Sequence, residues 1–585
     1  MNSLERNWQL RYFTLTLRMA TKRKAVDFEA VSGKKEKEED FFESHFNYKL
    51  DSVVAKALLE PHFGPEPSSS LLVEGFGHVQ CQQRSSDFPC GEITVRPFEN
   101  FGLSAKLLEN FRLLNGGPAS VTQNYLFNIM ARYKDLYITP SNPHHIILYC
   151  LHVLNHTVKT KNMVISNNER LDNLRSKGII NEEEIERARD QGFSRPKVLI
   201  LCPMRKDAFA VIDCFRKLIF GESSKGFVAN AKRFKAEFGD NGYRIHKDRN
   251  VCDEYKELMS GNNDDCFRIG VAVTKKGLRL YSSFEKSDII IASPLGLRVI
   301  VGDKSEENRE IGFLSSIEIL IIDKAEIILM QNWEQLLLIV NSINLTPEKI
   351  TVDISRVRQW SLEQQASLYR QTIISSSVQL TECRAIFALQ CCNFAGFYRL
   401  QPSSVGLLSE IEVPVSQELR KFVVDNPEDQ SESRFNFFKE KILPACETGT
   451  LVFIPSYFDF VKIRNHLKKE NDSFVQLSEY AKQGKVAKAR ELFFYGERKL
   501  MLLTERFHFF RRYHIKAIKS LVFYQLPALP SFYHEFINMV ISKSRVLVRV
   551  LYCRYDIDRL RNIFGDLNSE QLLNSKKNVH VLLSH

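Results

Sequence analysis

Basic and aromatic side chains gather in one stretch of the sequence, residues 481–520. This stretch holds eleven lysines and arginines against three glutamates, a net charge of +8, whereas the whole chain of 585 residues carries +11. Cationic groups neutralise RNA phosphates, and aromatic rings stack on unpaired bases. The composition therefore predicts contact with RNA or a ribonucleoprotein, with these candidate side chains: Arg498, Lys499, Arg506, Arg511, Arg512, Lys516 and Lys519.

A second interpretation of residues 481–520 requires no ligand. Phe493, Phe494 and Phe507 would then belong to the hydrophobic core, and the lysines would form the solvated face of a surface helix. A further candidate group, Arg205, Lys206 and Arg298, follows apolar runs. Ligands bind at the carboxyl ends of strands in open α/β sheets, so these three are also RNA-backbone candidates. Helix capping and ordinary surface charge explain them nearly as well.

The elements that must position these side chains follow an alternating pattern. From about residue 98, apolar runs alternate with longer amphipathic stretches, which is typical of a parallel sheet covered by helices. Strands are expected at 198–202, 267–273, 289–292, 317–322 and 372–374, and, after a polar break at 425–433, at 450–454, 499–503, 520–524 and 546–552. We therefore expect an α/β fold of two domains in tandem.

The chain divides into five expected segments. Residues 1–40 form a charged, disordered tail. Residues 41–97 hold a docking helix and a linker, with Phe42, His45 and Phe46 as candidates for contacting a partner. The first α/β domain covers 98–394, a hinge covers 395–435, and the second α/β domain covers 436–585.

Metal, disulfide and membrane chemistry are not expected. The twelve cysteines include no CxxC pair, which favours reduced thiols without zinc. His152 and His156 are four residues apart and would share a helix face, but no third ligand is near in sequence, so hydrogen bonding within the structure is favoured over a metal site. No apolar run reaches the roughly 18 residues that a membrane span needs.

The order of the segments resembles that of DEAD-box helicases. The relevant stretches are 198–205 (VLILCPMR), 287–298 (SDIIIASPLGLR), 319–326 (ILIIDKAE) and 370–377 (RQTIISSS). The resemblance implies two RecA-like domains and places Asp323, Lys324, Ala325 and Glu326 at the acid box. In active members of that family the first acid of the box helps to hold magnesium and the second positions water.

The groups that hydrolyse ATP are missing from this layout. No GxxxxGK[ST] loop occurs in the chain, and residues 139–161, where it would lie, contain no glycine. Lys324 replaces the second acid and cannot act as a carboxylate base. Residues 534–539 contain no arginine to stabilise a transferred phosphoryl group. We therefore expect a pseudo-helicase without catalytic residues, cofactor or metal. The alternative is a divergent RNA-dependent ATPase that uses Asp323 and Glu326.

Several stretches resemble one family closely. They are 40–46 (DFFESHF), 151–156 (LHVLNH), 288–298 (DIIIASPLGLR), 330–333 (MQNW) and 369–372 (YRQT). They resemble the digestive-organ-expansion-factor family, nucleolar helicase-like Utp proteins of the small-subunit processome. The resemblance implies a factor of the nucleus and nucleolus that acts in pre-rRNA processing. Its implied partners are pre-rRNA, snoRNA and processome proteins, with no small-molecule substrate. Trp333 is a candidate for packing or for docking a partner. A third possibility is an adaptor that binds only proteins.

Overall fold

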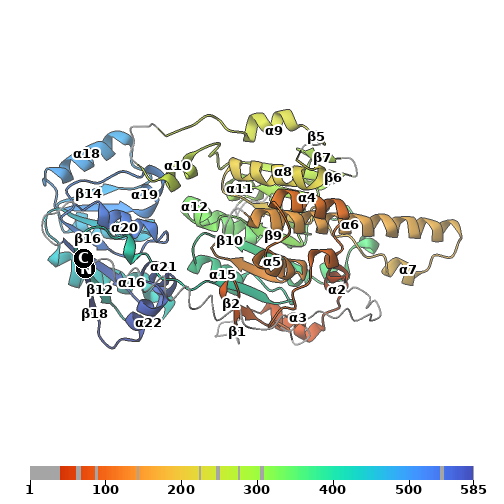
Figure 1. Ribbon diagram of the computed structural model, residues 1–585, viewed down its shortest axis with the longest axis horizontal. Helices are drawn as coiled ribbons and strands as arrows, with labels where there is room; N and C mark the ends of the chain where they lie inside the picture. Colours follow the sequence, from red (N-terminus) through yellow and green to blue (C-terminus); the bar gives the residue numbers. More distant parts are fainter. Residues whose placement is uncertain are drawn as a thin grey trace, which may run out of the picture. The chain divides into compact units, whose positions relative to one another are not determined.

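A computed structural model describes residues 40–60, 68–85, 88, 90–140, 144–222, 226–245, 251–274, 277–302, 309–540 and 546–583. The tail expected over residues 1–40 lies outside this part, apart from Asp40. The described residues form two β-sheets with helices around them (Figure 1). The α/β fold class is therefore confirmed.

The first sheet has eleven strands, and its centre is parallel. Their order is β1-β2-β11-β3-β10-β9-β4-β8-β6-β7-β5. The strands are β1 (Ser68–Val73), β2 (Gly77–Gln82), β3 (Asp135–Ile138), β4 (Val198–Leu201), β5 (Phe227–Ala229), β6 (Arg268–Thr274), β7 (Gly277–Leu280), β8 (Ile289–Ala292), β9 (Ile319–Ile322), β10 (Gln371–Ser375) and β11 (Phe397–Gln401). From β11 to β8 all neighbours are parallel, whereas β2 and β6 join this block in the antiparallel direction.

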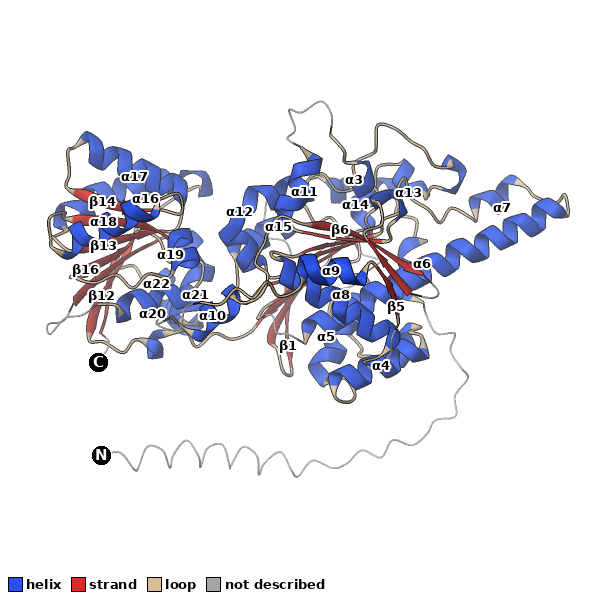
Figure 2. Ribbon diagram, turned by 90° about the horizontal axis from the view of Figure 1, so that it is seen from above, coloured by secondary structure: helices blue, strands red, loops and turns tan. Residues whose placement is uncertain are grey.

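Helices lie on both faces of this sheet (Figure 2). The helices of this half of the chain are α2 (Phe41–Phe46), α3 (Ser52–Leu59), α4 (Ala105–Asn115), α5 (Val121–Ala131), α6 (His145–Ser176), α7 (Glu182–Glu186), α8 (Arg205–Phe220), α9 (Ala231–Phe238), α10 (Asp253–Met259), α11 (Pro294–Val301), α12 (Ala325–Val340), α13 (Gln359–Leu362), α14 (Ala366–Tyr369) and α15 (Thr381–Leu389). Because both faces are covered, every residue of β3, β4, β8, β9 and β10 is buried. This is why β4, β8 and β9 consist of continuous apolar runs.

The second sheet has seven strands in the order β14-β15-β13-β16-β17-β12-β18. They are β12 (Val415–Lys421), β13 (Thr450–Ile454), β14 (Phe474–Leu477), β15 (Leu500–Thr504), β16 (Ser520–Phe523), β17 (Val546–Tyr552) and β18 (Val579–Leu583). Its helices are α16 (Gln430–Phe437), α17 (Tyr457–Lys469), α18 (Gln483–Phe494), α19 (Glu505–Arg511), α20 (Ser531–Asn538), α21 (Ile557–Phe564) and α22 (Asp566–Asn574). All pairs are parallel except β12 with β18.

All nine strands expected from the sequence are present, with ends that differ by at most two residues. Two of the expected segment limits need correction. The segment 41–97 is not only a helix and a linker, because β1 and β2 form a hairpin that pairs with β11. The hinge expected at 395–435 contains β11 of the first sheet and β12 of the second. Only residues 402–414 connect the two sheets.

Candidate functional site

The acid cluster lies where β9 ends and α12 begins. Asp323 follows the last residue of β9, Lys324 is the N-cap of α12, and buried Ala325 starts the helix. Lys324 has a φ of 52°, a left-handed conformation that is uncommon for a residue with a side chain. The cluster stands at the carboxyl ends of the parallel strands, where open α/β sheets bind ligands.

The carboxylate of Asp323 accepts hydrogen bonds from two hydroxyl groups of the protein. Tyr149 on α6 donates a hydrogen bond of 3.1 Å to Oδ2, and Ser375 at the end of β10 donates one of 2.5 Å to Oδ1. Asp323 and Tyr149 are both buried. Burial raises the pKa of Asp323, because removing the carboxylate from water disfavours its charged form. The side chain is therefore held inside the structure by its neighbours.

Lys324, the next residue in the chain, brings a positive charge close to this carboxylate. Its Nζ lies 2.6 Å from Oδ1 of Asp207, which is buried on α8. Burial opposes the charged form of Lys324, but the carboxylate of Asp207 raises the pKa of Lys324 above its ordinary value. Glu326 is buried too, accepts a hydrogen bond of 3.1 Å from the backbone N–H of Ser377, and has its pKa raised by burial.

This arrangement does not fit a bound magnesium–nucleotide complex. A magnesium ion needs carboxylate or water oxygens around it, and an ammonium group among the carboxylates opposes it. Within the described residues, no three His, Cys, Asp or Glu side chains are grouped so that they could hold a metal ion. The acid cluster is a hydrogen-bonded, ion-paired structural unit.

The basic stretch 481–520 divides into exposed and internal cations. The exposed candidates are Arg498, Arg511, Lys516 and Lys519, and Lys499 is half-buried. The exposed lysines Lys485 and Lys488 lie on α18. Arg490 connects this helix with the loop after α19, since its guanidinium lies 4.7 Å from the ring centre of Tyr513. Helix α18 and residues 512–519 therefore adjoin one another.

Two of the RNA candidates in this stretch are used inside the protein. Arg512 is buried, pairs with Glu535 at 2.7 Å and covers the ring of Phe532. Arg506 donates a hydrogen bond of 2.9 Å to the carbonyl of Met330. Arg512 is therefore not accessible to an external phosphate, which corrects its assignment as an RNA contact.

The candidates in the first half of the chain also have internal contacts. Arg205 begins α8 and bonds the carbonyl oxygens of Glu237 and Cys266. The ammonium group of Lys206 bonds three carbonyl oxygens at the end of α10, at distances of 2.5–3.1 Å. Arg298 is half-buried on α11. Lys206 therefore caps the carboxyl end of α10, which is the explanation that requires no RNA.

The aromatic rings in the basic stretch also divide into two groups. Phe493 and Phe507 are buried, as the interpretation without a ligand requires, and so is Phe509. Phe494 and Tyr495 are instead 50% and 69% exposed, with their ring centres 5.2 Å apart. Tyr480 and Phe458, which the sequence did not single out, are exposed as well. Exposed aromatic rings and exposed cations are the groups with which proteins bind single-stranded RNA.

The docking residues expected on the first helix are buried in the protein's own core. Phe42, His45 and Phe46 are each at most 3% exposed. Nε2 of His45 lies 3.0 Å from the carbonyl oxygen of Tyr369, and burial lowers the pKa of His45 to about 3. These side chains hold α2 on the first domain and cannot reach a partner, so their assignment is wrong. Trp333, half-buried on α12, packs against the core.

The two histidines on α6 have the structural roles that the sequence favours. His152 is hydrogen-bonded to Gln371 at 2.7 Å. His156 lies 3.1 Å from the hydroxyl of Tyr133 and 3.1 Å from Glu318. The part of the chain with described coordinates contains no helix long and apolar enough to cross a bilayer.

Fold and site together define an α/β protein with two largely parallel sheets and an ion-paired acid cluster at the strand ends. Family models describe two parts of the chain: the UTP25 NTP hydrolase-like domain matches residues 133–398, and the Utp25 C-terminal domain matches 407–582. The U3 small nucleolar RNA-associated protein 25 homolog of Mus musculus is 37% identical over 580 residues, which cover 93% of this chain and 73% of that protein. The chain belongs to the Utp25 family.

The protein with the same name from Xenopus tropicalis is 41% identical over 480 residues. The match covers 79% of this chain but only 62% of that protein, so the chain spans less than two thirds of its length. Among solved structures, the yeast DEAD-box splicing factor Prp28 matches at 13% identity over 85% of this chain and 92% of that chain, with a TM-score of 0.31. A TM-score of this size supports no conclusion about function.

Proposed function

We propose that this chain is a non-catalytic, RNA-binding assembly factor of the small-subunit processome that acts in the nucleolus on precursor ribosomal RNA. Family membership and the name of the relatives, which are U3 small nucleolar RNA-associated proteins, support the processome role. Two RecA-like domains, one around each sheet, would serve as a scaffold. Its partners would be pre-rRNA, snoRNA and processome proteins.

The proposal that the protein is not a catalyst rests on one observation: the side chains of the acid cluster already bind other groups of the protein. Tyr149 and Ser375 use both oxygens of Asp323, and Lys324 is paired with Asp207. A phosphate or a metal ion would have to displace these contacts. The missing GxxxxGK[ST] loop removes the backbone N–H groups that would hold the phosphates.

Calorimetric titration of the full chain with ATP and magnesium, with and without single-stranded RNA, tests this part. We expect no binding at micromolar nucleotide. Micromolar affinity that needs magnesium and is lost in Asp323→Ala would instead establish the alternative, a divergent RNA-dependent ATPase that uses Asp323 and Glu326.

The RNA-binding part rests on the exposed cations and rings of residues 480–519. Crosslinking of the full chain to RNA, followed by mapping of the crosslinked peptides, tests it. We expect crosslinks within residues 481–520. RNA binding without crosslinks there would place the contact elsewhere. A chain that binds processome proteins but no RNA, and so yields no crosslinks within 481–561, would be an adaptor for proteins only.

A further inference from the structure

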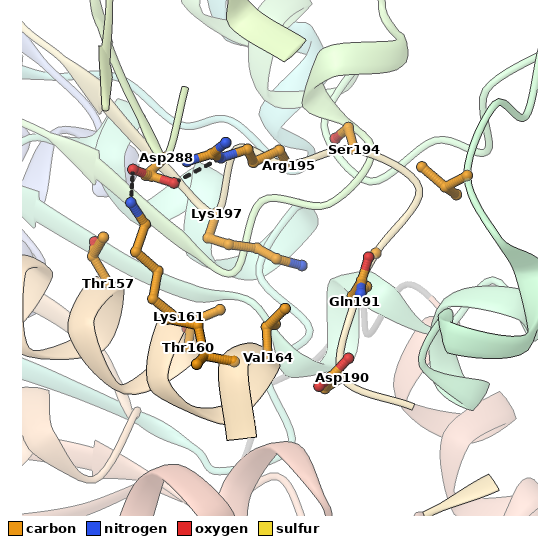
Figure 3. A pocket seen from close by; sticks show the side chains of 13 residues that line it. Thr157, Thr160, Lys161, Val164, Asp190, Gln191, Ser194, Arg195, Lys197 and Asp288 are labelled. Carbon is orange, nitrogen blue, oxygen red and sulfur yellow. Dashed lines mark hydrogen bonds and ion pairs between the residues drawn. The ribbon is translucent and has the colours of Figure 1, made fainter. Parts of the chain in front are cut away.

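A pocket of about 430 Å³ opens at the edge of the first sheet that lies opposite the acid cluster (Figure 3). Lys197 and Asp288 line it and stand immediately before β4 and β8, so the pocket lies at the amino ends of the parallel strands. Asp323 follows β9 at the carboxyl ends of the same block. The pocket is therefore a separate site, formed by the middle of α6, residues 190–195 and Val352.

Two cations of this pocket share one carboxylate. Asp288 is 2.5 Å from Nζ of Lys161 and 2.9 Å from Nε of Arg195, and Figure 3 shows both side chains converging on it. Asp288 also accepts a hydrogen bond from the backbone N–H of Val273. The bond to Arg195 uses only Nε, and within the described residues its two terminal amino groups have no hydrogen-bond partner. Arg195 is thus a half-exposed cation whose terminal amino groups can donate hydrogen bonds to a ligand.

The remaining charges around the pocket are neutralised in pairs. Asp190 receives two hydrogen bonds from Arg356, at 2.7 and 2.9 Å, and one from Asn167. The ammonium group of Lys197 is buried and lies 2.9 Å from Glu318. One positive charge is left over, and it belongs to the cluster of Lys161, Arg195 and Asp288. An anion entering the pocket would be attracted to this cluster.

The rest of the lining is suited to an apolar group. Val164, Ile165 and Val352 contribute side chains to the wall. Thr157 and Thr160 donate their hydroxyl protons to backbone carbonyls of α6, at 2.8 and 2.9 Å. A pocket of this volume lies within the range of roughly 300–1,000 Å³ found for organic ligands, which bind in largely apolar pockets with a few polar groups.

We propose that this pocket binds an organic anion, a single carboxylate carried on an apolar carbon skeleton. The carboxylate would accept hydrogen bonds from the terminal amino groups of Arg195, whose planar fork matches its geometry. The skeleton would contact Val164 and Ile165. RNA fits poorly, because the pocket offers one uncompensated positive charge and an apolar wall instead of the row of cations that a polyanion requires. The carboxylate has two possible sources, a free carboxylic acid or an acidic side chain beside an apolar one in a partner protein.

Saturation-transfer NMR on the full chain with hexanoate and with the capped peptide acetyl-Leu-Glu-Leu-amide tests the proposal. We expect transfer to hexanoate and at least tenfold weaker binding of hexanamide, which has the same skeleton without the charge. Arg195→Gln and Ile165→Glu should each weaken hexanoate binding at least tenfold. Arg187→Gln is the matched control, because Arg187 pairs with Glu183 on α7 outside the pocket.

The outcomes identify the source of the carboxylate or overturn the proposal. Hexanoate binding without peptide binding assigns a free carboxylic acid, and tighter binding of the peptide assigns a partner protein's side chains. Failure of both probes to bind the folded wild-type protein overturns the proposal. Equal binding by the wild type, Arg195→Gln and Ile165→Glu, all with unchanged thermal unfolding, overturns it too.

Discussion

Tyr149 of α6 donates a hydrogen bond of 3.1 Å to Asp323 at the end of β9, joining two residues 174 positions apart. Helix α6 follows β3, the place where nucleotide-binding α/β proteins carry a glycine-rich loop and a helix whose first N–H groups bind phosphate. Here the same helix supplies a buried phenol that binds the carboxylate. The contact is therefore internal to the protein and joins α6 to the end of β9.

The mutation Lys324→Glu places a carboxylate next to Asp323, and we expect it to destabilise the protein rather than create activity. It breaks the ion pair with Asp207 and leaves that buried carboxylate beside another negative charge. Lys324 is 42% exposed, so solvent reduces the effect to about 2 kcal/mol in the free energy of unfolding. Urea denaturation measures it.

The control for this experiment is Lys286→Glu, at an exposed position before β8. Combining Lys324→Glu with Asp207→Asn should recover about half of the loss, because the repulsion is removed. A urea midpoint for Lys324→Glu equal to that of the wild type would show that the ion pair contributes nothing.

We expect Glu505 to make the stability of the protein dependent on pH. Its carboxylate is buried and accepts hydrogen bonds from the backbone N–H groups of Ala528 and Leu529, and burial raises the pKa of Glu505 to about 7. Because the pKa is higher in the folded state, the stability it contributes is complete below pH 4.5 and is lost as the pH rises to about 7. Glu505→Gln should therefore gain stability relative to the wild type between pH 5 and 8, by about 3 kcal/mol.

Unfolding by urea at several pH values, compared between the two proteins, measures this gain. Glu497→Gln, an exposed glutamate in the same part of the chain, should show no pH-dependent difference from the wild type. Parallel pH profiles for Glu505→Gln and the wild type would mean that Glu505 does not change its protonation in this range.

The central strands were predictable because burial on both faces produces continuous apolar runs. Residues 289–292 are all apolar and all buried. The last two strands of the second sheet were not predictable in this way: β12 reads VSQELRK and buries only alternate residues, and its neighbour β18, at the edge, exposes alternate residues. Such strands form because they pair with a neighbouring strand, and the sequence does not show which strand that neighbour is.

The acid cluster was predictable because its residues are contiguous, whereas its neighbours were not. Asp323 and Glu326 stand in one short motif, but Tyr149 reaches them only through the packing of α6. The same limit applies to Arg512, which appears as one more cation in a basic stretch until Glu535 and the ring of Phe532 enclose it. Local charge patterns show where cations occur, and only the fold shows which of them face water.

An ion pair connects helices from the two halves of the chain. Arg384 on α15 lies 3.0 Å from Asp558 on α21, and Arg559 lies 3.3 Å from Glu382 beside it. Because the side chain of Arg384 is 41% exposed, we expect a coupling energy of about 1 kcal/mol between Arg384 and Asp558. A double-mutant cycle with Arg384→Ala and Asp558→Ala, followed by thermal unfolding, measures it. Additive effects of the two mutations would show that the pair is not coupled.

The exposed rings and lysines around α18 predict how RNA binding would respond to mutation. Replacing Phe494 and Tyr495 by alanine should weaken binding of a labelled single-stranded RNA at least fivefold, because each stacked base contributes about 1–3 kcal/mol. Lys485→Glu with Lys488→Glu should weaken it as well and reduce the salt dependence of the binding constant, because fewer counterions are released. Fluorescence anisotropy at several salt concentrations measures both effects.

The charge-matched control for the lysine variant is Lys576→Glu with Lys577→Glu, at two exposed positions before β18. If binding responds only to total charge, both lysine pairs will weaken it equally and the aromatic variant will bind like the wild type. If the surface around α18 is the contact, its lysine pair alone will change the salt dependence, and the aromatic variant will lose affinity with an unchanged salt dependence. Rings act through stacking and release no counterions, so the two variants separate the two contributions to RNA binding.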